Sequence, residues 1–199
     1  MAIDALTEYG MDDMVKAAMA KWPHVPACYG WLGLDRRGHW WMRDEAAQAC
    51  GPFSGPGATP ASRGARLEHA QLIAFIHRNY AADEQGRWYF QNGPQRVFVE
   101  LDRAPWIWRL QTPETVTSHT GQTTSVRACQ VDEAGLLYLD TPMGWGLVHT
   151  QDMDLAADWL IDGRWTVTEA SFESLRAAAG VVLSPLACSR AGSDSDEHP

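Results

Sequence analysis

The clearest pattern along the chain is the alternation of apolar and polar residues on both sides of Asn92-Gly93. In the run before this dipeptide, Trp88 and Phe90 share one face of the expected strand. A second alternating run follows, and Asn-Gly between two such runs favours a two-residue type I′ turn, because both central residues of that turn need positive φ. The pattern therefore predicts a hairpin that pairs residues 88–91 with residues 94–97.

Apolar residues at helical spacing predict four helices. The first would be capped by Asp12 or Asp13, and the last would end at Gly180. The expected helical ranges are residues 13–22, 66–80, 155–161 and 169–179. Further strands are expected at residues 40–42 and 106–110, and a second hairpin within residues 136–150. The run from residue 50 to residue 64 is rich in Gly and Pro and is expected to form a loop.

A turn of the form Asp-x-x-Gly occurs three times at almost equal intervals. It starts at Asp35, Asp83 and Asp132, which are 48 and 49 residues apart, and a degenerate copy starts at Asp162. The Asp side chain can accept backbone N–H groups of the turn, and Gly at the fourth position tolerates positive φ. A repeat protein is one interpretation of this spacing. Because the segment before the second turn is helical and the segment before the third is strand-like, we favour a supersecondary unit duplicated within one globular fold.

These elements predict an α+β protein of antiparallel hairpins or small sheets with packed helices, in which two subdomains share a core. A chain of 199 residues can bury roughly 70% of its unfolded surface. We expect an N-terminal part with the first helix, the first turn and strand and the loop, then a part with a helix and the central hairpin. A third part holds the second hairpin and the last helices, and a disordered acidic tail follows. The corresponding ranges are residues 1–65, 66–112, 113–184 and 185–199.

Charge and cysteine usage narrow the range of functions. The formal net charge of −9 opposes binding to nucleic acid, whose affinity comes from Lys and Arg that neutralise phosphates. The N-terminus lacks the basic and apolar regions of a signal peptide, and no run approaches the roughly 18 apolar residues of a membrane span, so we expect a cytoplasmic protein. The cysteines form no Cys-x-x-Cys pair, which predicts free thiols. They are Cys28, Cys50, Cys129 and Cys188.

The polar residues show no spacing typical of a catalytic or metal site, so neither a cofactor nor a metal is expected. His69 and His77 share a predicted helix, but their separation of eight residues places them about two turns apart, too far to hold one ion. Ser54 lacks the Gly-x-Ser-x-Gly elbow of a nucleophile. The best candidate for an acid/base pair is His149 with Asp152.

The chain contains ten tryptophans, and core packing would account for most of them. We expect two or three aromatic residues, among Trp41, Tyr89 and Trp145, to be partly exposed and to form a recognition patch, since aromatic anchors dominate interface energetics. Strand alternation places Arg87, Tyr89 and Arg96 on one face of the hairpin. This set could bind an acidic ligand or partner, while the alternative is a solvated face held by internal ion pairs. The expected binding residues are Arg87, Tyr89, Arg96, Trp41 and Trp145.

Residues 79–99, with the Asp83 turn and the hairpin, resemble a family of uncharacterised proteobacterial proteins, and the similarity extends from Val25 to Trp159. More distantly, residues 94–106 resemble a second uncharacterised bacterial family, in which an Asp-x-x-Gly turn precedes each hairpin and α+β motifs are repeated. The resemblance implies an α+β architecture with duplicated pieces and a sensing or signalling role. Neither family defines catalytic residues, so none is carried over.

Two classes of function follow from these observations. The first is a non-catalytic binding or regulatory module that recognises a small ligand or a protein partner, since aromatic hairpins without a nucleophile or metal cluster suit recognition better than chemistry. The second is a small enzyme that uses dispersed residues such as His149 and Asp152. An assembly or structural role is a third interpretation. The sequence pattern specifies neither the partner nor the oligomeric state.

Overall fold

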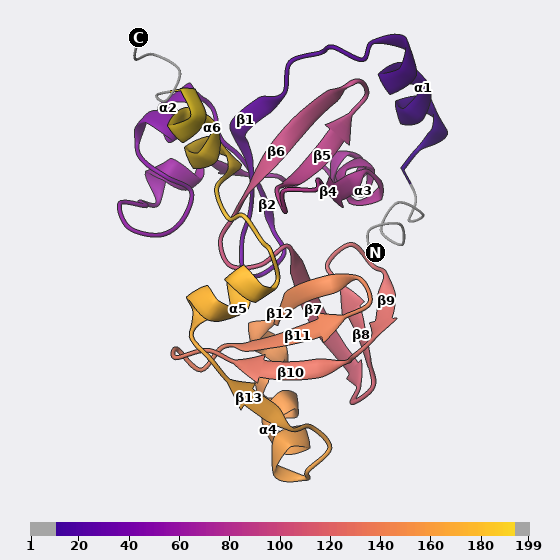
Figure 1. The fold of residues 1–199 in the computed structure, drawn as a ribbon, viewed down its shortest axis with the longest axis vertical. Coiled ribbons are helices and arrows are strands. Elements are labelled where there is room, and N and C mark those ends of the chain that lie inside the picture. Colours follow the sequence, from indigo (N-terminus) through magenta and orange to yellow (C-terminus); the bar gives the residue numbers. More distant parts are fainter. Residues whose placement is uncertain (1–10, 194–199) are drawn as a thin grey trace. The chain divides into compact units, whose positions relative to one another are not determined.

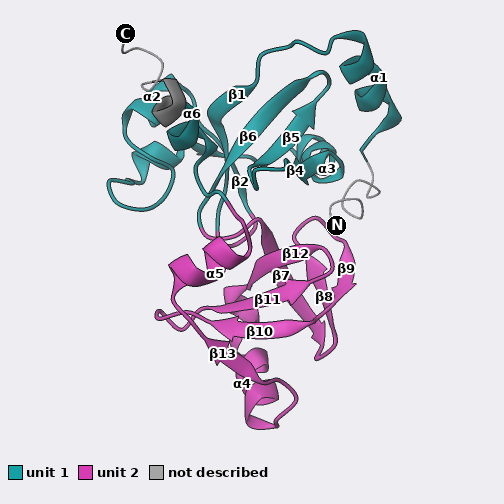
Figure 2. Ribbon diagram, in the orientation of Figure 1, with its two compact units in different colours: residues 1–35, 39–102, 182–199 teal, residues 36–38, 103–181 magenta. Residues whose placement is uncertain are grey.

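The computed structural model describes residues 11–193, and within this range the chain forms two compact units (Figure 2). Of the described residues, unit 1 contains 11–35, 39–102 and 182–193, whereas unit 2 contains 36–38 and 103–181. Each unit is built on its own sheet (Figure 1). The chain therefore leaves unit 1 after residue 102 and returns to it at residue 182.

Unit 1 contains a six-stranded sheet with the order β3-β2-β1-β6-β5-β4. Neighbouring strands are antiparallel except β1 and β6, which are parallel. The strands are β1 (Cys28–Leu34), β2 (Trp40–Met42), β3 (Ala65–Arg66), β4 (Tyr80–Ala82), β5 (Trp88–Asn92) and β6 (Gln95–Leu101).

Unit 2 contains a seven-stranded sheet with the order β13-β10-β11-β12-β7-β8-β9. Strands β7 and β12 are parallel, as are β10 and β13, and the other neighbours are antiparallel. The strands are β7 (Trp106–Thr112), β8 (Thr115–Ser118), β9 (Thr123–Ser125), β10 (Ala128–Val131), β11 (Leu137–Thr141), β12 (Gly144–Val148) and β13 (Val167–Glu169).

The two sheets share one topology. The order β9-β8-β7-β12-β11-β10 in unit 2 matches β3-β2-β1-β6-β5-β4 in unit 1 strand for strand, and β13 is an additional edge strand. In both sheets a parallel pair lies at the centre of the six equivalent strands: β1 with β6 in unit 1, and β7 with β12 in unit 2. The predicted α+β class with a duplicated supersecondary unit is therefore confirmed, and the duplicated unit comprises six strands.

The three Asp-x-x-Gly turns form with the same hydrogen bonds. In each, the N–H four residues after the Asp donates to its Oδ1, at 2.9, 3.0 and 2.9 Å, and the Gly has a φ of 79°, 74° or 75°. The Asp83 turn joins β4 to β5 and the Asp132 turn joins the equivalent strands β10 and β11. The Asp35 turn joins β1 to β2, whose equivalents in unit 2 are joined at residues 113–114. Only the second and third turns are therefore internal equivalents.

Six α-helices and two 3₁₀ turns surround these sheets in the described range (Figure 1). They are α1 (Asp13–Lys21), α2 (Glu45–Ala49), η1 (Ala61–Arg63), α3 (Ala70–Arg78), η2 (Thr150–Asp152), α4 (Met153–Ile161), α5 (Phe172–Ala178) and α6 (Pro185–Ser193). Within residues 11–193, no helix is long and apolar enough to cross a membrane.

Four helices differ from the sequence-based predictions. Helix α2 lies where no helix was expected, and α5 begins at Phe172 rather than at residue 169, because Ser171 caps it. Helix α3 begins at Ala70 rather than at residue 66, because His69 caps it through Nδ1, 3.2 Å from the N–H of Leu72, and Arg66 pairs with β2. Residues 185–193 form α6, so the expectation of a disordered tail from residue 185 is wrong for this stretch. Glu100 of β6 supplies the long-range contact that the local sequence does not show, since its Oε1 accepts the N–H of Leu186 at 3.1 Å.

The central hairpin is confirmed, but its turn lies one residue later than predicted. Asn92 pairs with Gln95, so the two loop residues are Gly93 and Pro94. Gly93 has a φ of +55°, and no described residue other than glycine has positive φ. A type I′ turn needs positive φ at both loop residues, which proline cannot adopt, whereas a type II′ turn needs it only at the first. Pro94 therefore sets the turn type and shifts the register.

Replacing Gly93 with valine is expected to destabilise the protein by about 1–3 kcal/mol, through the strain of positive φ at a β-branched residue. No atom lies within 4 Å of an added Cβ, so steric overlap contributes little. Gly93→Asn is the matched control, because Asn tolerates this backbone conformation better. Urea unfolding of the two variants measures the difference, and equal stabilities would contradict the assigned turn.

Aromatic side chains dominate the cores of both units. In unit 1, α3 covers one face of the sheet, with the rings of Phe75 and Phe90 5.4 Å apart. Trp40 donates its indole N–H to Nε2 of His77 at 2.9 Å, and burial lowers the pKa of His77 to about 4, so this imidazole is neutral. Seven of the ten tryptophans are buried: Trp40, Trp88, Trp106, Trp108, Trp145, Trp159 and Trp165.

Candidate functional site

The second face of the β5–β6 hairpin carries a cluster of aromatic and arginine side chains, which we call the arginine–aromatic face. Its members are Tyr29 of β1, Arg87 at the start of β5, Tyr89 of β5, and Arg96 and Phe98 of β6. Tyr89 lies directly opposite Phe98 in the ladder, and Arg96 lies opposite Gln91. Side chains two residues apart on a strand share a face, which is why the alternating sequence gathers these residues.

The rings of this face are covered by guanidinium groups. Tyr29 stacks on Phe98 with ring centroids 4.7 Å apart and an interplanar angle of 10°. Arg87 lies over Phe98, and Arg96 lies over Tyr89, each with its guanidinium carbon 4.7 Å from the ring centroid. Tyr89 is 6% exposed and Phe98 2% exposed, so the aromatic layer is buried beneath the arginines. The outer layer of this face therefore consists of guanidinium groups.

The two arginines differ in their electrostatic environment. Arg87 is neutralised by Asp83, with Nη2 2.7 Å and Nε 2.8 Å from Oδ2. Arg96 is half-buried, and its side chain forms no hydrogen bond or ion pair with any residue in the described range. A planar guanidinium with free donors can bind a carboxylate or phosphate in bidentate fashion. Arg96 is therefore the group on this face that is available to an anion.

Tyr89 supports Arg96 and is not suited to proton transfer. Burial raises the pKa of its phenol, the charge of Arg96 lowers it and that of Asp83 raises it, with the net pKa above the usual value. The phenol therefore stays protonated at neutral pH. Its role on this face is to hold the guanidinium through a cation–π contact, an interaction of about 0.5–2 kcal/mol.

Two residues expected to belong to the recognition patch lie elsewhere. Trp41 is on β2, separated from β5 by β1 and β6, and its indole N–H donates to Asp35 Oδ2 at 3.0 Å. Trp145 is in unit 2, 5% exposed, and stacks on Tyr138. The expectation that Tyr89 and Trp145 are partly exposed is wrong, because Arg96 covers the first and the core of unit 2 encloses the second.

Unit 2 repeats the geometry of this face with different chemistry. Tyr138 lies six residues after Asp132, just as Tyr89 lies six residues after Asp83. Trp145 pairs with Asp140, eight residues after Asp132, and Arg96 pairs with the equivalent residue, Gln91. The rings of Tyr138 and Trp145 are stacked 4.6 Å apart. The internal duplicate therefore places an indole where unit 1 places a guanidinium. The sequence contains this correspondence, but only the strand pairing identifies it.

A cleft of about 660 Å³ lies beside α2 and α6 in unit 1. Its polar lining includes Arg43 and Glu100, which are 1% and 3% exposed. Arg43 donates to the carbonyls of residues 62, 30 and 51, and Glu100 accepts the N–H of Leu186. Because both charges hold neighbouring main chain in place, we place the candidate site on the arginine–aromatic face. The sequence gives no local signal for this cleft.

His149 and Asp152, the candidate acid/base pair, both form hydrogen bonds that stabilise the local fold. Asp152 forms a bidentate ion pair with Arg109, at 2.7 and 2.9 Å, and accepts the N–H of Leu110 at 3.0 Å. Burial raises the pKa of Asp152, but the hydrogen bonds from Arg109 and Leu110 outweigh it and lower the net pKa. His149 accepts the N–H of Gln151 at 3.1 Å as the cap of η2. Both groups therefore serve the local fold.

The side chains that could bind a metal are dispersed within residues 11–193. No three of the described His, Cys, Asp or Glu side chains are grouped so that they could hold an ion. All four cysteines are free thiols.

The fold and the site define an internally duplicated α+β protein with an arginine-covered face on a hairpin. The chain belongs to the DUF2944 family, described as "Protein of unknown function (DUF2946)", whose model matches residues 11–188. The expected relationship to an uncharacterised family is thus confirmed. A comparison with curated proteins finds no match.

Two solved structures of proteins described as DUF1285 family members are similar to this chain. One, from Silicibacter pomeroyi DSS-3, is 16% identical, with 78% of this chain and 80% of that chain covered and a TM-score of 0.45. The other, from Shewanella baltica OS155, is 12% identical, with 64% of this chain and 91% of that chain covered and a TM-score of 0.42.

Proposed function

We propose that the protein is a non-catalytic binding module with a regulatory role, and that its arginine–aromatic face recognises an acidic group on a partner. Arg96 makes the primary contact, and Tyr89 and Phe98 form the layer that orients it. The net charge of −9 disfavours nucleic acid as the source of that group, because affinity for its row of phosphates needs many Lys and Arg side chains and this face has one arginine without an ion pair among the described residues. A protein carboxylate cluster or an acidic small ligand fits this surface.

One observation carries this proposal. Of the two guanidinium groups on the face, Arg87 is compensated by Asp83, whereas Arg96 has no ion pair or hydrogen bond within residues 11–193. A half-buried cation without such a partner is costly to keep, since part of its hydration is lost on folding. The internal duplicate shows that the position accepts an uncharged aromatic residue, Trp145. The presence of arginine at this position in unit 1 is therefore best explained by recognition.

Titration of the isotopically labelled protein with the probe acetyl-Glu-Glu-amide tests the proposal. We expect chemical-shift changes at the side-chain N–H of Arg96 and at Tyr89, with affinity in the millimolar range. Arg96→Ala should weaken binding at least about fivefold, equivalent to roughly 1 kcal/mol. The matched control is Arg66→Ala, since Arg66 is an exposed arginine on β3 of the same sheet. Equal effects of the two substitutions, or shifts confined to other surfaces, would contradict the proposal.

A further inference from the structure

We infer that the partner docks on the arginine–aromatic face through the first turn of a helix, which carries an aromatic residue followed by an acidic one. This inference rests on the proposed function of that face and specifies the chemistry of its partner. Its basis is the way in which unit 2 covers the equivalent face with its own helix α5.

In unit 2, the first residue of α5, Phe172, contacts both the Asp132 turn and the stacked rings of Tyr138 and Trp145. Glu133, the residue after the turn Asp, accepts the N–H of Phe172 through Oε2 at 2.7 Å, and this hydrogen bond is the main cause of the lowered pKa of Glu133. The ring of Phe172 lies 6.0 Å from that of Tyr138 and 6.3 Å from that of Trp145. A carboxylate at a helix start and an aromatic ring on the stack thus fix this helix on the sheet.

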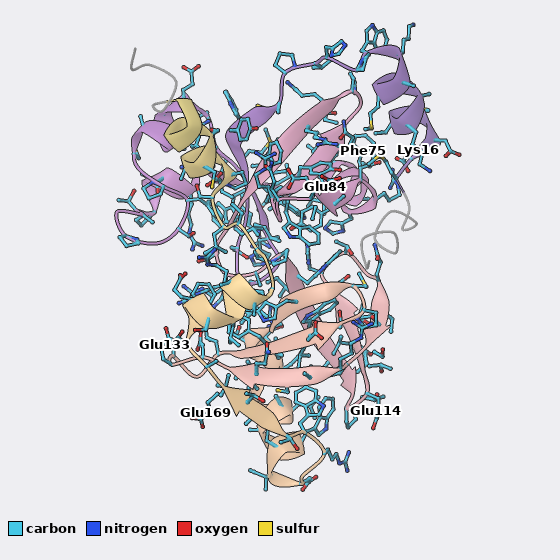
Figure 3. The ribbon with its side chains drawn as sticks, viewed as in Figure 1. Lys16, Phe75, Glu84, Glu114, Glu133 and Glu169 are labelled. Carbon is cyan, nitrogen blue, oxygen red and sulfur yellow. The ribbon has the colours of Figure 1, made fainter. Side chains whose placement is uncertain are left out.

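Unit 1 retains the groups that receive such a helix. Glu84 follows Asp83 as Glu133 follows Asp132, and Figure 3 labels both carboxylates. Glu84 is exposed and forms no hydrogen bond or ion pair with other described residues. Tyr89 occupies the position of Tyr138. Unit 1 thus offers an acceptor for a helix N–H at the Asp83 turn, in addition to Glu100 of β6, which already accepts the N–H of Leu186 at the start of α6. It also has a tyrosine at the position of Tyr138, here covered by Arg96.

The difference between the two faces identifies the additional group that the partner must carry. Arg96 replaces Trp145, so the helix that meets unit 1 needs an anion where α5 meets an indole. Acidic residues are favoured in the first turn of a helix, and α5 itself has Glu173 directly after Phe172. A partner of the form Ser or Asp, aromatic, Glu would present N–H groups to Glu84, a ring to the guanidinium layer and a carboxylate to Arg96.

Because Glu84 and Arg96 carry opposite charges, the binding of a helix start can be distinguished from the binding of a simple anion. A free carboxylate or phosphate is attracted by Arg96 but repelled by Glu84. A helix start provides both a donor for Glu84 and a carboxylate for Arg96. Removal of the charge at Glu84 should therefore strengthen the binding of a simple anion and weaken the binding of a helix start.

The test uses the full-length labelled protein and two probes. The first is a peptide with the sequence of residues 169–180, Glu-Ala-Ser-Phe-Glu-Ser-Leu-Arg-Ala-Ala-Ala-Gly, acetylated and amidated. The second is acetyl-Glu-Glu-amide. We expect Glu84→Gln to weaken the peptide at least threefold and to leave the acidic probe unchanged or tighter. Arg96→Ala should weaken both probes, and replacement of Phe by Ala in the peptide should abolish its shifts.

The outcomes separate this inference from the proposed function. If the acidic probe binds at Arg96 and the peptide does not, or if Glu84→Gln leaves the peptide unaffected, the helix inference is overturned and the proposed function remains. If neither probe shifts Arg96 or Tyr89, both are overturned. Peptide shifts confined to Tyr138 and Phe172 would show exchange with α5 in unit 2 and would also overturn the inference.

Discussion

Replacing Gly146 with alanine is expected to destabilise the protein by about 3 kcal/mol or more. A Cβ at this position would overlap Nε1 of Trp108 and would lie 2.6 Å from both Cβ and the carbonyl oxygen of Trp106. The two indoles are stacked 5.8 Å apart in the buried centre of unit 2. The backbone oxygen belongs to the paired strand β7 and cannot yield without breaking the ladder, so overpacking is severe.

Urea unfolding measures this loss. The matched control is Gly163→Ala, because Gly163 has a φ of +69° and open space around an added Cβ, so its substitution reports backbone strain alone. We expect the control to cost about 1 kcal/mol. A Gly146→Ala variant within about 1 kcal/mol of the parent protein would show that strand β7 or its indoles move aside.

Replacing Arg43 with alanine is expected to cost about 3–5 kcal/mol. The side chain is 1% exposed and donates to the carbonyl oxygens of Ser62, Gly30 and Gly51 at 2.7, 3.2 and 2.7 Å. Its removal leaves these acceptors without their donor and opens a cavity, two effects that each destabilise by a few kcal/mol. The segment between residues 51 and 64 should then become sensitive to proteolysis, since Arg43 holds both of its ends.

Thermal unfolding measures the loss of stability in Arg43→Ala, and limited proteolysis measures the exposure of residues 51–64. Arg66→Ala removes an arginine from an exposed position on β3 and should change stability by no more than about 0.5 kcal/mol. Arg43→Lys should recover only part of the loss, because an ammonium group cannot reproduce the fork of donors. Unchanged cleavage within residues 51–64 would contradict the anchoring role of Arg43.

Local sequence patterns predicted the elements whose structure is determined locally. The Asp-x-x-Gly turns need only the Asp carboxylate and the Gly backbone, and all three form as expected. The hairpin was likewise predicted by alternation, but the rigid φ of Pro94 displaced its turn by one residue. Competing turn signals in adjacent residues explain that error.

Long-range pairing was not predictable from the sequence in the same way. The parallel pair of β1 and β6 joins residues more than 60 positions apart, and its counterpart in unit 2 joins β7 to β12. The regular spacing of the three turns obscured this duplication, because the Asp35 turn does not occupy a position equivalent to the other two. Glu100, which fixes the start of α6, likewise acts through a contact that no local motif indicates.

The candidate site was predicted in part. Strand alternation correctly gathered Arg87, Tyr89 and Arg96 on one face. Alternation does not show that Asp83 neutralises Arg87 and leaves Arg96 without an ion pair in the described range. That difference depends on the Asp83 turn, which brings its carboxylate to Arg87. Whether this face binds a partner stays a prediction.

The return of the chain to unit 1 has a consequence for biosynthesis. Strands β1 to β6 leave the ribosome well before residue 182, yet the N–H of Leu101 donates to the carbonyl of Leu183, and Glu100 accepts the N–H of Leu186. A nascent chain that ends anywhere within unit 2 therefore lacks the partners of these two groups. Because these bonds form only after residue 186 has been synthesised, unit 1 is completed after the whole of unit 2 has left the ribosome.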